Sequence, residues 1–185
     1  MAHCVSVEVE RPRASDTFLI DSNVLIYVAY SPLGQGEVAR ALGYVYSGFL
    51  QRCYNAGSKL YVSGLSYPEI ANVVERFRWT EYGGDAVVGR KGFRELAPHR
   101  EVVLADLEEV WRQVTSTATV LATTIDEAAV QRIATLFRGS RIDGYDGFLI
   151  DAARQAKIPN VITHDRDFAS ASNLVVFTAN SALLS

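Results

Sequence analysis

Short apolar blocks alternate with helix-spaced apolar residues along this chain, and the alternation predicts strands separated by helices. Apolar runs bounded by turn residues are typical of buried strands, and apolar positions three or four residues apart are typical of helices. Strands are expected at 17–21, 59–63, 118–123, 161–163 and 174–177. One helix is expected to start within 22–27. Five further helices are expected at 37–55, 67–78, 100–114, 126–137 and 145–156.

This order of elements predicts the α/β class. Strands alternating with helices form a mostly parallel central sheet with helices on both faces, a three-layer α/β/α sandwich. Residues 1–16 are expected to form a loose N-terminal arm or an extra edge element, and residues 17–185 a single domain. The stretch 79–98 is rich in glycine and charge, which indicates an insertion, taken as 79–118, or a mobile flap.

Glycine and proline residues mark where helices stop. Gly57 is placed to end the helix over 37–55. Pro32, Gly34 and Gly36 predict a loop before that helix.

Composition restricts the classes of function. With 18 Lys and Arg against 21 Asp and Glu, the net charge is -3, so nucleic acid would have to be bound through a local basic patch or through metal ions. Cys4 and Cys53 lie far apart and show no zinc-ligand spacing, which suits a reducing cytoplasm. No signal-peptide pattern and no apolar run of about 18 residues is seen, so we expect a cytoplasmic protein without membrane association.

Four acidic residues stand where an α/β sheet places its ligands, beyond the carboxyl ends of the strands. Asp21 ends the first strand, and Asp165 follows the strand 161–163 after one intervening residue. Glu69 and Asp146 lie at the starts of two helices. We therefore expect all four side chains on one rim of the sheet.

Carboxylates packed together repel one another unless a cation compensates their charge. Mg²⁺ and Mn²⁺ prefer oxygen ligands and are the natural compensators. Such ions activate water and neutralise charge developing on a phosphodiester, so the acids predict metal-dependent hydrolysis with Mg²⁺ or Mn²⁺ as cofactor.

Some of these acids also have purely structural interpretations. Asp21 could be a strand-end or helix-capping acid. The pattern Ser66-x-x-Glu69 is a capping box, which alone could account for the glutamate. Asp143 is expected to cap the helix starting at 145, and Asp151 to lie on a solvated helix face.

Two further residues lie beside the fourth acid. His164 has no partner at metal-ligand spacing, so we interpret it as a neighbour of the site rather than a ligand. Asp167 is interpreted as a supporting acid or as the cap of the following turn.

Four segments resemble the motifs of the PIN domain family, in the family's order. They are FLIDSNVLI (18–26), LSYPEI (65–70), YDGFLI (145–150) and VITHDRDF (161–168), and the resemblance extends over about residues 17–178. It implies a parallel-sheet sandwich that cleaves RNA endonucleolytically with Mg²⁺ or Mn²⁺.

The resemblance also implies residue roles. Asp21, Glu69, Asp146 and Asp165 take the family's acidic, catalytic and metal-binding positions, with Asp167 as an additional metal-binding acid. Ser22 and Thr163 match hydroxyl positions beside the metal, and Asn23 is assigned to the same surroundings.

A single domain of this kind most resembles the VapC-type toxin ribonucleases, which implies a small antitoxin partner and a homodimer. The chain departs from that pattern in its length, chiefly between Arg78 and Ala118 and at its N-terminus, and in having Gly147-Phe148 and Asp151. None of these departures removes an acid.

The middle of the chain is locally basic. Arg76, Arg78, Arg90, Lys91, Arg94 and Arg100 are candidates for contact with RNA phosphates, with Trp79, Tyr82 or Phe93 for stacking. The alternative is an ordinary solvated surface.

The helix over 37–55 carries more apolar and aromatic residues than one buried stripe requires. The excess indicates a homodimer interface or a groove for an antitoxin peptide, or a surface that other segments cover.

Two other functions compete with the nuclease hypothesis. One is a non-catalytic PIN scaffold that binds RNA or a protein partner, against which the complete set of acids argues. The other is a phosphoryl-accepting or phosphatase α/β domain built around Asp21, which would need a second acid where Asn23 stands. No P-loop or dinucleotide-binding glycine motif is present.

Overall fold

The computed structural model contains one six-stranded sheet in the order β1-β6-β5-β2-β3-β4, with every neighbouring pair parallel. Residues 1–30 and 36–184 are described, so Pro32 and Gly34 of the expected loop lie outside the described residues. The strands are β1 (His3–Ser6), β2 (Thr17–Ile20), β3 (Lys59–Ser63), β4 (Thr119–Leu121), β5 (Asn160–Ile162) and β6 (Val175–Thr178).

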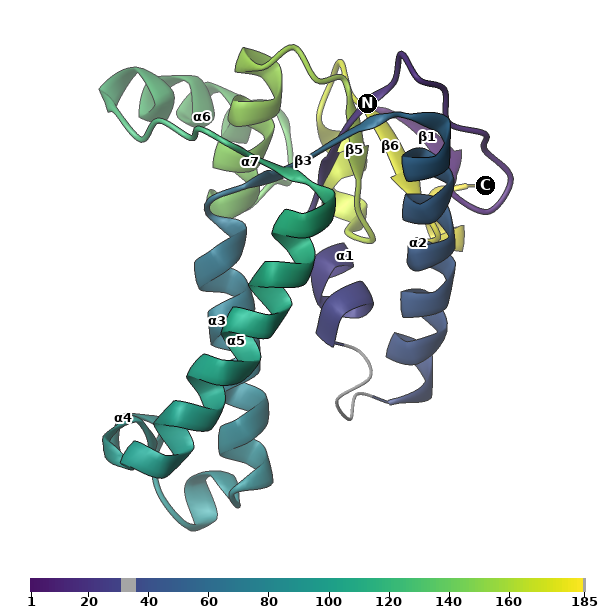
Figure 1. Cartoon of the computed structure of the whole chain (residues 1–185). Helices are drawn as coiled ribbons and strands as arrows, with labels where there is room; N and C mark the ends of the chain where they lie inside the picture. Colours follow the sequence, from purple (N-terminus) through teal and green to yellow (C-terminus); the bar gives the residue numbers. More distant parts are fainter. Residues whose placement is uncertain (31–35, 185) are drawn as a thin grey trace.

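Helices cover the sheet, and two of them extend well beyond it (Figure 1). The α-helices are α1 (Ser22–Leu25), α2 (Glu37–Ala56), α3 (Ser66–Glu81), α4 (Arg90–Glu95), α5 (Ala97–Thr117), α6 (Glu127–Gly139) and α7 (Gly144–Gln155). The shorter elements are the π-helix η1 (Ile26–Tyr30) and the 3₁₀ turns η3 (Gly84–Ala86), η4 (Arg166–Ser170) and η5 (Ser181–Leu183).

Successive residues of a strand point to opposite faces of the sheet, and this alternation divides the core into two clusters. Phe18 and Ile20 of β2 join the cluster formed with the first five helices. Leu19 joins the second cluster, with Leu149 and Ile150 of α7. The expected three-layer sandwich is therefore confirmed.

The first residues form an edge strand. β1 pairs in parallel with β6, with His3 opposite Val175, which is the second of the two arrangements expected for residues 1–16. Gly57 ends α2 in a left-handed conformation (φ 75°), as predicted.

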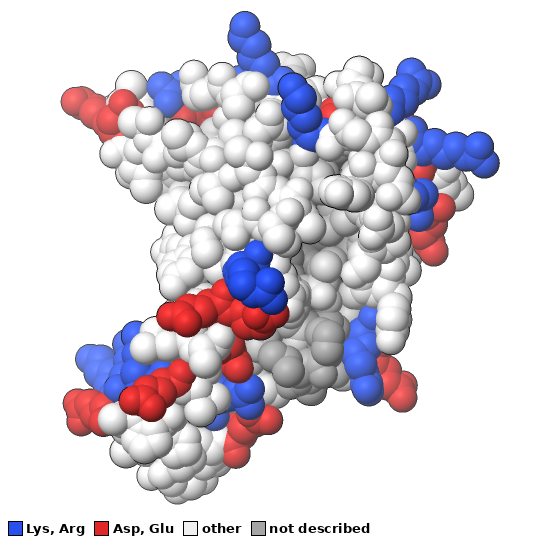
Figure 2. Space-filling view, viewed as in Figure 1, with Lys and Arg blue, Asp and Glu red and all other residues white. Residues whose placement is uncertain are grey.

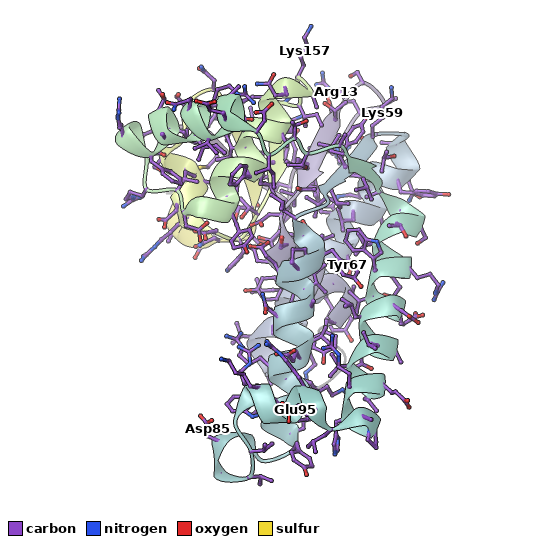
Figure 3. The ribbon with its side chains drawn as sticks, turned by 90° about the vertical axis from the view of Figure 1, so that its left-hand side faces the viewer. Arg13, Lys59, Tyr67, Asp85, Glu95 and Lys157 are labelled. Atoms are coloured by element: carbon purple, nitrogen blue, oxygen red, sulfur yellow. The ribbon has the colours of Figure 1, made fainter. Side chains whose placement is uncertain are left out.

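The stretch 79–98, expected to be the least regular, is largely helical. It completes α3 and then forms η3 and α4, with Phe93 buried and the Trp79 indole donating to the Val88 carbonyl at 2.7 Å. We call α3, η3, α4 and α5 the helical arm. Figure 3 shows it from the side, with Asp85 and Glu95 at its tip.

One buried carboxylate connects the three helices of the helical arm. Glu75 of α3 is 6% exposed and accepts hydrogen bonds from Arg90 and Arg94, both at 2.8 Å. Arg100 of α5 lies 3.5 Å from the same carboxylate. Arg78 makes a second link to α5 through Asp106 at 2.6 Å.

The expectation for Asp151 is corrected. It is buried rather than solvated, because Arg132 of α6 donates two 2.7 Å hydrogen bonds to its carboxylate. Gly147 allows the same two helices to approach closely, since a Cβ there would stand 2.7 Å from a methyl group of Ile133. The departures at Gly147 and Asp151 thus serve the packing of α7 against α6.

Replacement of Glu75 tests whether this carboxylate holds the helical arm together. Glu75→Gln should lower the free energy of unfolding by roughly 1–2 kcal/mol, between the values for exposed and buried ion pairs, because three arginines lose their shared counter-charge. Urea denaturation measures the change. Glu109→Gln, which breaks the exposed pair with Arg112, is the matched control and should have little effect. Equal effects of the two substitutions would contradict the role of Glu75.

Candidate active site

Four acids lie at the carboxyl edge of the central strands. Asp21 directly follows β2, and Asp165 follows β5, the strand paired with β2. Glu69 lies in the first turn of α3, which follows β3, and Asp146 lies in the first turn of α7. Besides burial, which is the largest cause, repulsion from Asp21, Asp143, Asp165 and Glu69 raises the pKa of Asp146, so these acids lie near one another.

Asp21 is buried, with only 3% of its surface exposed. It occupies the N-cap position of α1 but makes no capping hydrogen bond with its side chain. Its Oδ2 instead accepts a 2.6 Å hydrogen bond from the Thr163 hydroxyl, so the capping interpretation is wrong.

Glu69 does not belong to a capping box. The residue before α3 is Leu65, no side-chain capping bond is made there, and the Ser66 hydroxyl is already inside the helix. Glu69 accepts a hydrogen bond from the hydroxyl of Ser22, the residue after Asp21. This contact directs the glutamate toward the start of α1, where the other acids lie.

Thr163 and Asn23 fix the backbone around the acids. The Thr163 hydroxyl donates to Asp21 and accepts from the backbone N–H of Asp165 (2.9 Å) and from the Asn23 amide (3.4 Å). One donor and two acceptor positions are thus all used. The side-chain Oδ1 of Asn23 accepts from the backbone N–H of His164 (3.2 Å), which ties the loop after β5 to α1.

The remaining acids near the site have separate structural contacts. Asp143 caps α7, as expected, by accepting from the backbone N–H groups of Tyr145 and Asp146. Asp165 caps η4 by accepting from the N–H of Asp167 at 2.8 Å. Asp167 lies farther out, with 40% of its side chain exposed and Arg141 at 3.9 Å.

Tyr46 of α2 is a supporting residue that sequence reasoning missed. It is fully buried, and its hydroxyl lies 3.1 Å from the Thr163 carbonyl and 3.0 Å from His164 Nδ1. The same hydroxyl accepts from the N–H of Ala179 at 3.1 Å. In the sequence Tyr46 is one apolar position among many in its helix, so no local signal distinguishes it.

Burial dominates the electrostatics of the acids. It raises the pKa of Asp21 to about 7, against the hydrogen bond from Thr163, with repulsion from Glu69 and Asp165 adding to the rise. It raises the pKa of Asp146 to about 8, with Asp21 the largest repelling charge. Burial also raises the pKa of Glu69. A cation nearby would favour the ionised form of each of these carboxylates.

Residues 18–174, most of the chain, match the PIN domain family. The chain belongs to the PIN domain family. No curated protein sequence matches it.

Solved structures resemble this PIN domain in fold. VapBC2 from Rickettsia felis, bound to a DNA fragment from its promoter, matches with 12% identity and a TM-score of 0.54, covering 88% of this chain and 98% of that chain. FitAcB from Neisseria gonorrhoeae matches with 20% identity and a TM-score of 0.49, covering 87% and 96%.

The donor set of this PIN domain fits a hard divalent cation. Only oxygen ligands are offered by Asp21, Glu69, Asp146 and Asp165. The raised pKa values of Asp21, Glu69 and Asp146 mark a place where positive charge is favoured. Within residues 1–30 and 36–184, no three His, Cys, Asp or Glu side chains form a ready-made ligand set for one ion.

The described helices include none long and apolar enough to cross a membrane.

The arginines expected to contact RNA are mostly engaged within the helical arm. Arg78, Arg90 and Arg94 form ion pairs with acids of α3 and α5. In the described part of the chain, Arg76 and Lys91 have no ion-pair partner. The net positive charge available to a ligand is therefore smaller than the sequence indicates.

Metal-free protein should lose stability as the pH rises. Asp21 and Asp146 have folded-state pKa values of about 7 and about 8 against an ordinary value of 3.8, so the folded state binds more protons between these limits. The stability they contribute is complete below the ordinary value and is lost as pH rises through about 7 to 8. Thermal unfolding in chelator across this range measures the effect.

Asp146→Asn should flatten this pH dependence and stabilise the metal-free protein at the alkaline end. Asp85→Asn, an exposed acid at the tip of the helical arm, is the matched control and should leave the slope unchanged. A wild-type slope in Asp146→Asn would show that this carboxyl does not titrate as described.

Proposed function

We propose that this PIN domain is a metal-dependent endoribonuclease that acts as the toxin of a toxin–antitoxin pair. The observation that carries the proposal is the convergence of four acids at one sheet edge, two of them with pKa values raised to about 7 and about 8. A purely structural site would not concentrate repelling charges without compensation, and perturbed carboxyls are typical of functional sites.

In this proposal Asp21 and Asp146 hold Mg²⁺ or Mn²⁺, and Glu69 and Asp165 complete the site directly or through water. The ion, when bound, activates water and neutralises charge on a phosphodiester. Thr163 keeps Asp21 in place through its hydrogen bond. Ser22 does the same for Glu69.

Substitution of the acids tests the proposal. Purified protein should cleave single-stranded RNA with Mg²⁺ or Mn²⁺ and lose the activity in chelator. Asp21→Asn and Asp146→Asn keep the shape of each side chain and should lower the rate by roughly 100-fold or more while leaving the protein folded. Cleavage is followed on a labelled RNA, with circular dichroism as the folding check.

Asp85→Asn again provides the control, because it removes an acid of equal charge far from the site. Undiminished cleavage in chelator would rule out the metal-dependent mechanism. Near-normal rates in both active-site variants would rule out the assignment of the acids.

An open groove beside α2 supports the proposal of an antitoxin partner. It has a volume of about 500 Å³ and lies between η1, α2 and α5, with Leu25, Leu50, Tyr54 and Val114 among its lining residues. Figure 2 shows that the face between α5 and α2 carries few charged side chains. An amphipathic segment of a small antitoxin fits such a surface. The structural neighbour VapBC2 is itself bound to promoter DNA.

The same helix supports a homodimer. Val38 and Tyr44 of α2 are 75% and 81% exposed, and apolar side chains so exposed favour burial against a second chain.

We expect light scattering at micromolar concentration to give the mass of a dimer and Val38→Glu to shift it toward the monomer. Val87→Glu, at an exposed valine of the helical arm, is the control. A wild-type monomer at this concentration would contradict the dimer and leave the nuclease proposal standing.

A further inference from the structure

A second groove opens beside the acids, between η1 and α3. It has a volume of about 470 Å³ and is lined by residues from both elements. Those used below are Asn23, Ile26, Tyr27, Val73, Arg76 and Phe77. We call it the η1–α3 groove.

The η1–α3 groove approaches the acidic centre at Asn23. Asn23, two residues after Asp21, lines the groove and also hydrogen-bonds Thr163 and the His164 backbone. On α3, Glu69, Val73 and Arg76 follow at spacings of four and three and so share one helix face. Arg76 lies about 10 Å along the helix axis from Glu69, so the groove continues the acid-bearing face of α3.

The wall of the groove combines aromatic surface with one cation. Tyr27 and Phe77 are aromatic, and Ile26 and Val73 are aliphatic. Arg76 is exposed and has neither an ion pair nor a side-chain hydrogen bond among the described residues. A flat apolar surface beside an uncompensated guanidinium suits a nucleobase followed by a phosphate.

Tyr27 is held in place before any ligand binds. Its ring lies parallel to that of Tyr46, with centroids 6.3 Å apart, and His164 meets it edge-on at 5.7 Å. A ring fixed in this way loses little conformational entropy when a base packs on it. Tyr27 also belongs to a π-helix, a rare element found frequently at functional sites.

We propose that the η1–α3 groove binds the nucleotide next to the scissile phosphate of a single-stranded RNA, with its base against Tyr27 and its phosphate at Arg76. The proposal rests on the nuclease function proposed above and adds a subsite to it. The charge of Arg76 favours a polyanion over the apolar segment proposed for the groove beside α2.

Binding can be measured separately from cleavage. In the full-length Asp146→Asn protein, fluorescence anisotropy of a labelled single-stranded RNA is recorded over a salt series. Adding Arg76→Gln should reduce the slope of log affinity against log salt by about 0.7, the loss of one single-strand phosphate contact. Arg40→Gln, an exposed arginine of α2 without an ion pair in the described residues, is the matched control and should keep the slope.

The aromatic contact has its own test in the same background. Tyr27→Leu should weaken RNA binding roughly fivefold or more, the equivalent of one lost base stack. Tyr27→Phe retains the ring and should restore most of the affinity, which a general loss of structure would not allow.

The outcomes separate this proposal from the proposed function. If wild-type protein cleaves RNA but Arg76→Gln keeps the full salt slope, the groove does not hold the strand and the nuclease function stands. If Tyr27→Leu and Tyr27→Phe weaken RNA binding equally, the ring does not hold a base and the proposal fails. If wild-type protein neither binds nor cleaves RNA, both proposals fail together.

Discussion

Carboxylates held close together repel one another, and in this PIN domain the repulsion is concentrated at the carboxyl edge of the sheet, where Asp21 is buried and Asp146 and Glu69 are partly buried. Asp21 cannot move away from its neighbours, because β2 places it between two apolar cores and its surface is almost entirely covered. Asp146 is brought toward it by α7, whose packing on α6 depends on Gly147 and on the buried Asp151. The rest of the fold supplies the free energy that keeps these charges together.

The hydrogen bonds that hold the acids in place come from several elements. Thr163, the residue after β5, donates a hydrogen bond to Asp21, and Asn23 of α1 accepts one from the backbone N–H of His164. Tyr46 reaches the same loop from α2 and also binds the backbone after β6. Because each of these groups comes from a different part of the chain, the positions of the acids depend on the complete sandwich rather than on one loop.

This dependence explains what the sequence could predict and what it could not. The strands and the acids that follow them were predictable, since an apolar run ending in Asp21 or near Asp165 is a local pattern. The contacts of Glu69 and Asp151 were not predictable, because their partners are distant in sequence. Glu69 contacts Ser22, whereas the local pattern indicated a capping box. Asp151 contacts Arg132, whereas the local pattern indicated a solvated helix face. The ion pairs of the basic stretch were unpredictable for the same reason, because Glu75 pairs with Arg90 and Arg94, which lie 15 and 19 residues beyond it in the chain.

The helix α3 connects the acidic centre with the rest of the helical arm. Its first turn presents Glu69 to the acids, its buried side packs Ile70 and Val74 into the core, and Glu75 fastens it to α4 and α5. A helix fixed at both ends keeps the face bearing Arg76 at a constant position relative to the acids. Ion pairs that occupy arginines in the helical arm therefore contribute indirectly to the proposed RNA-binding groove, because they orient Arg76, which has no ion-pair partner among the described residues.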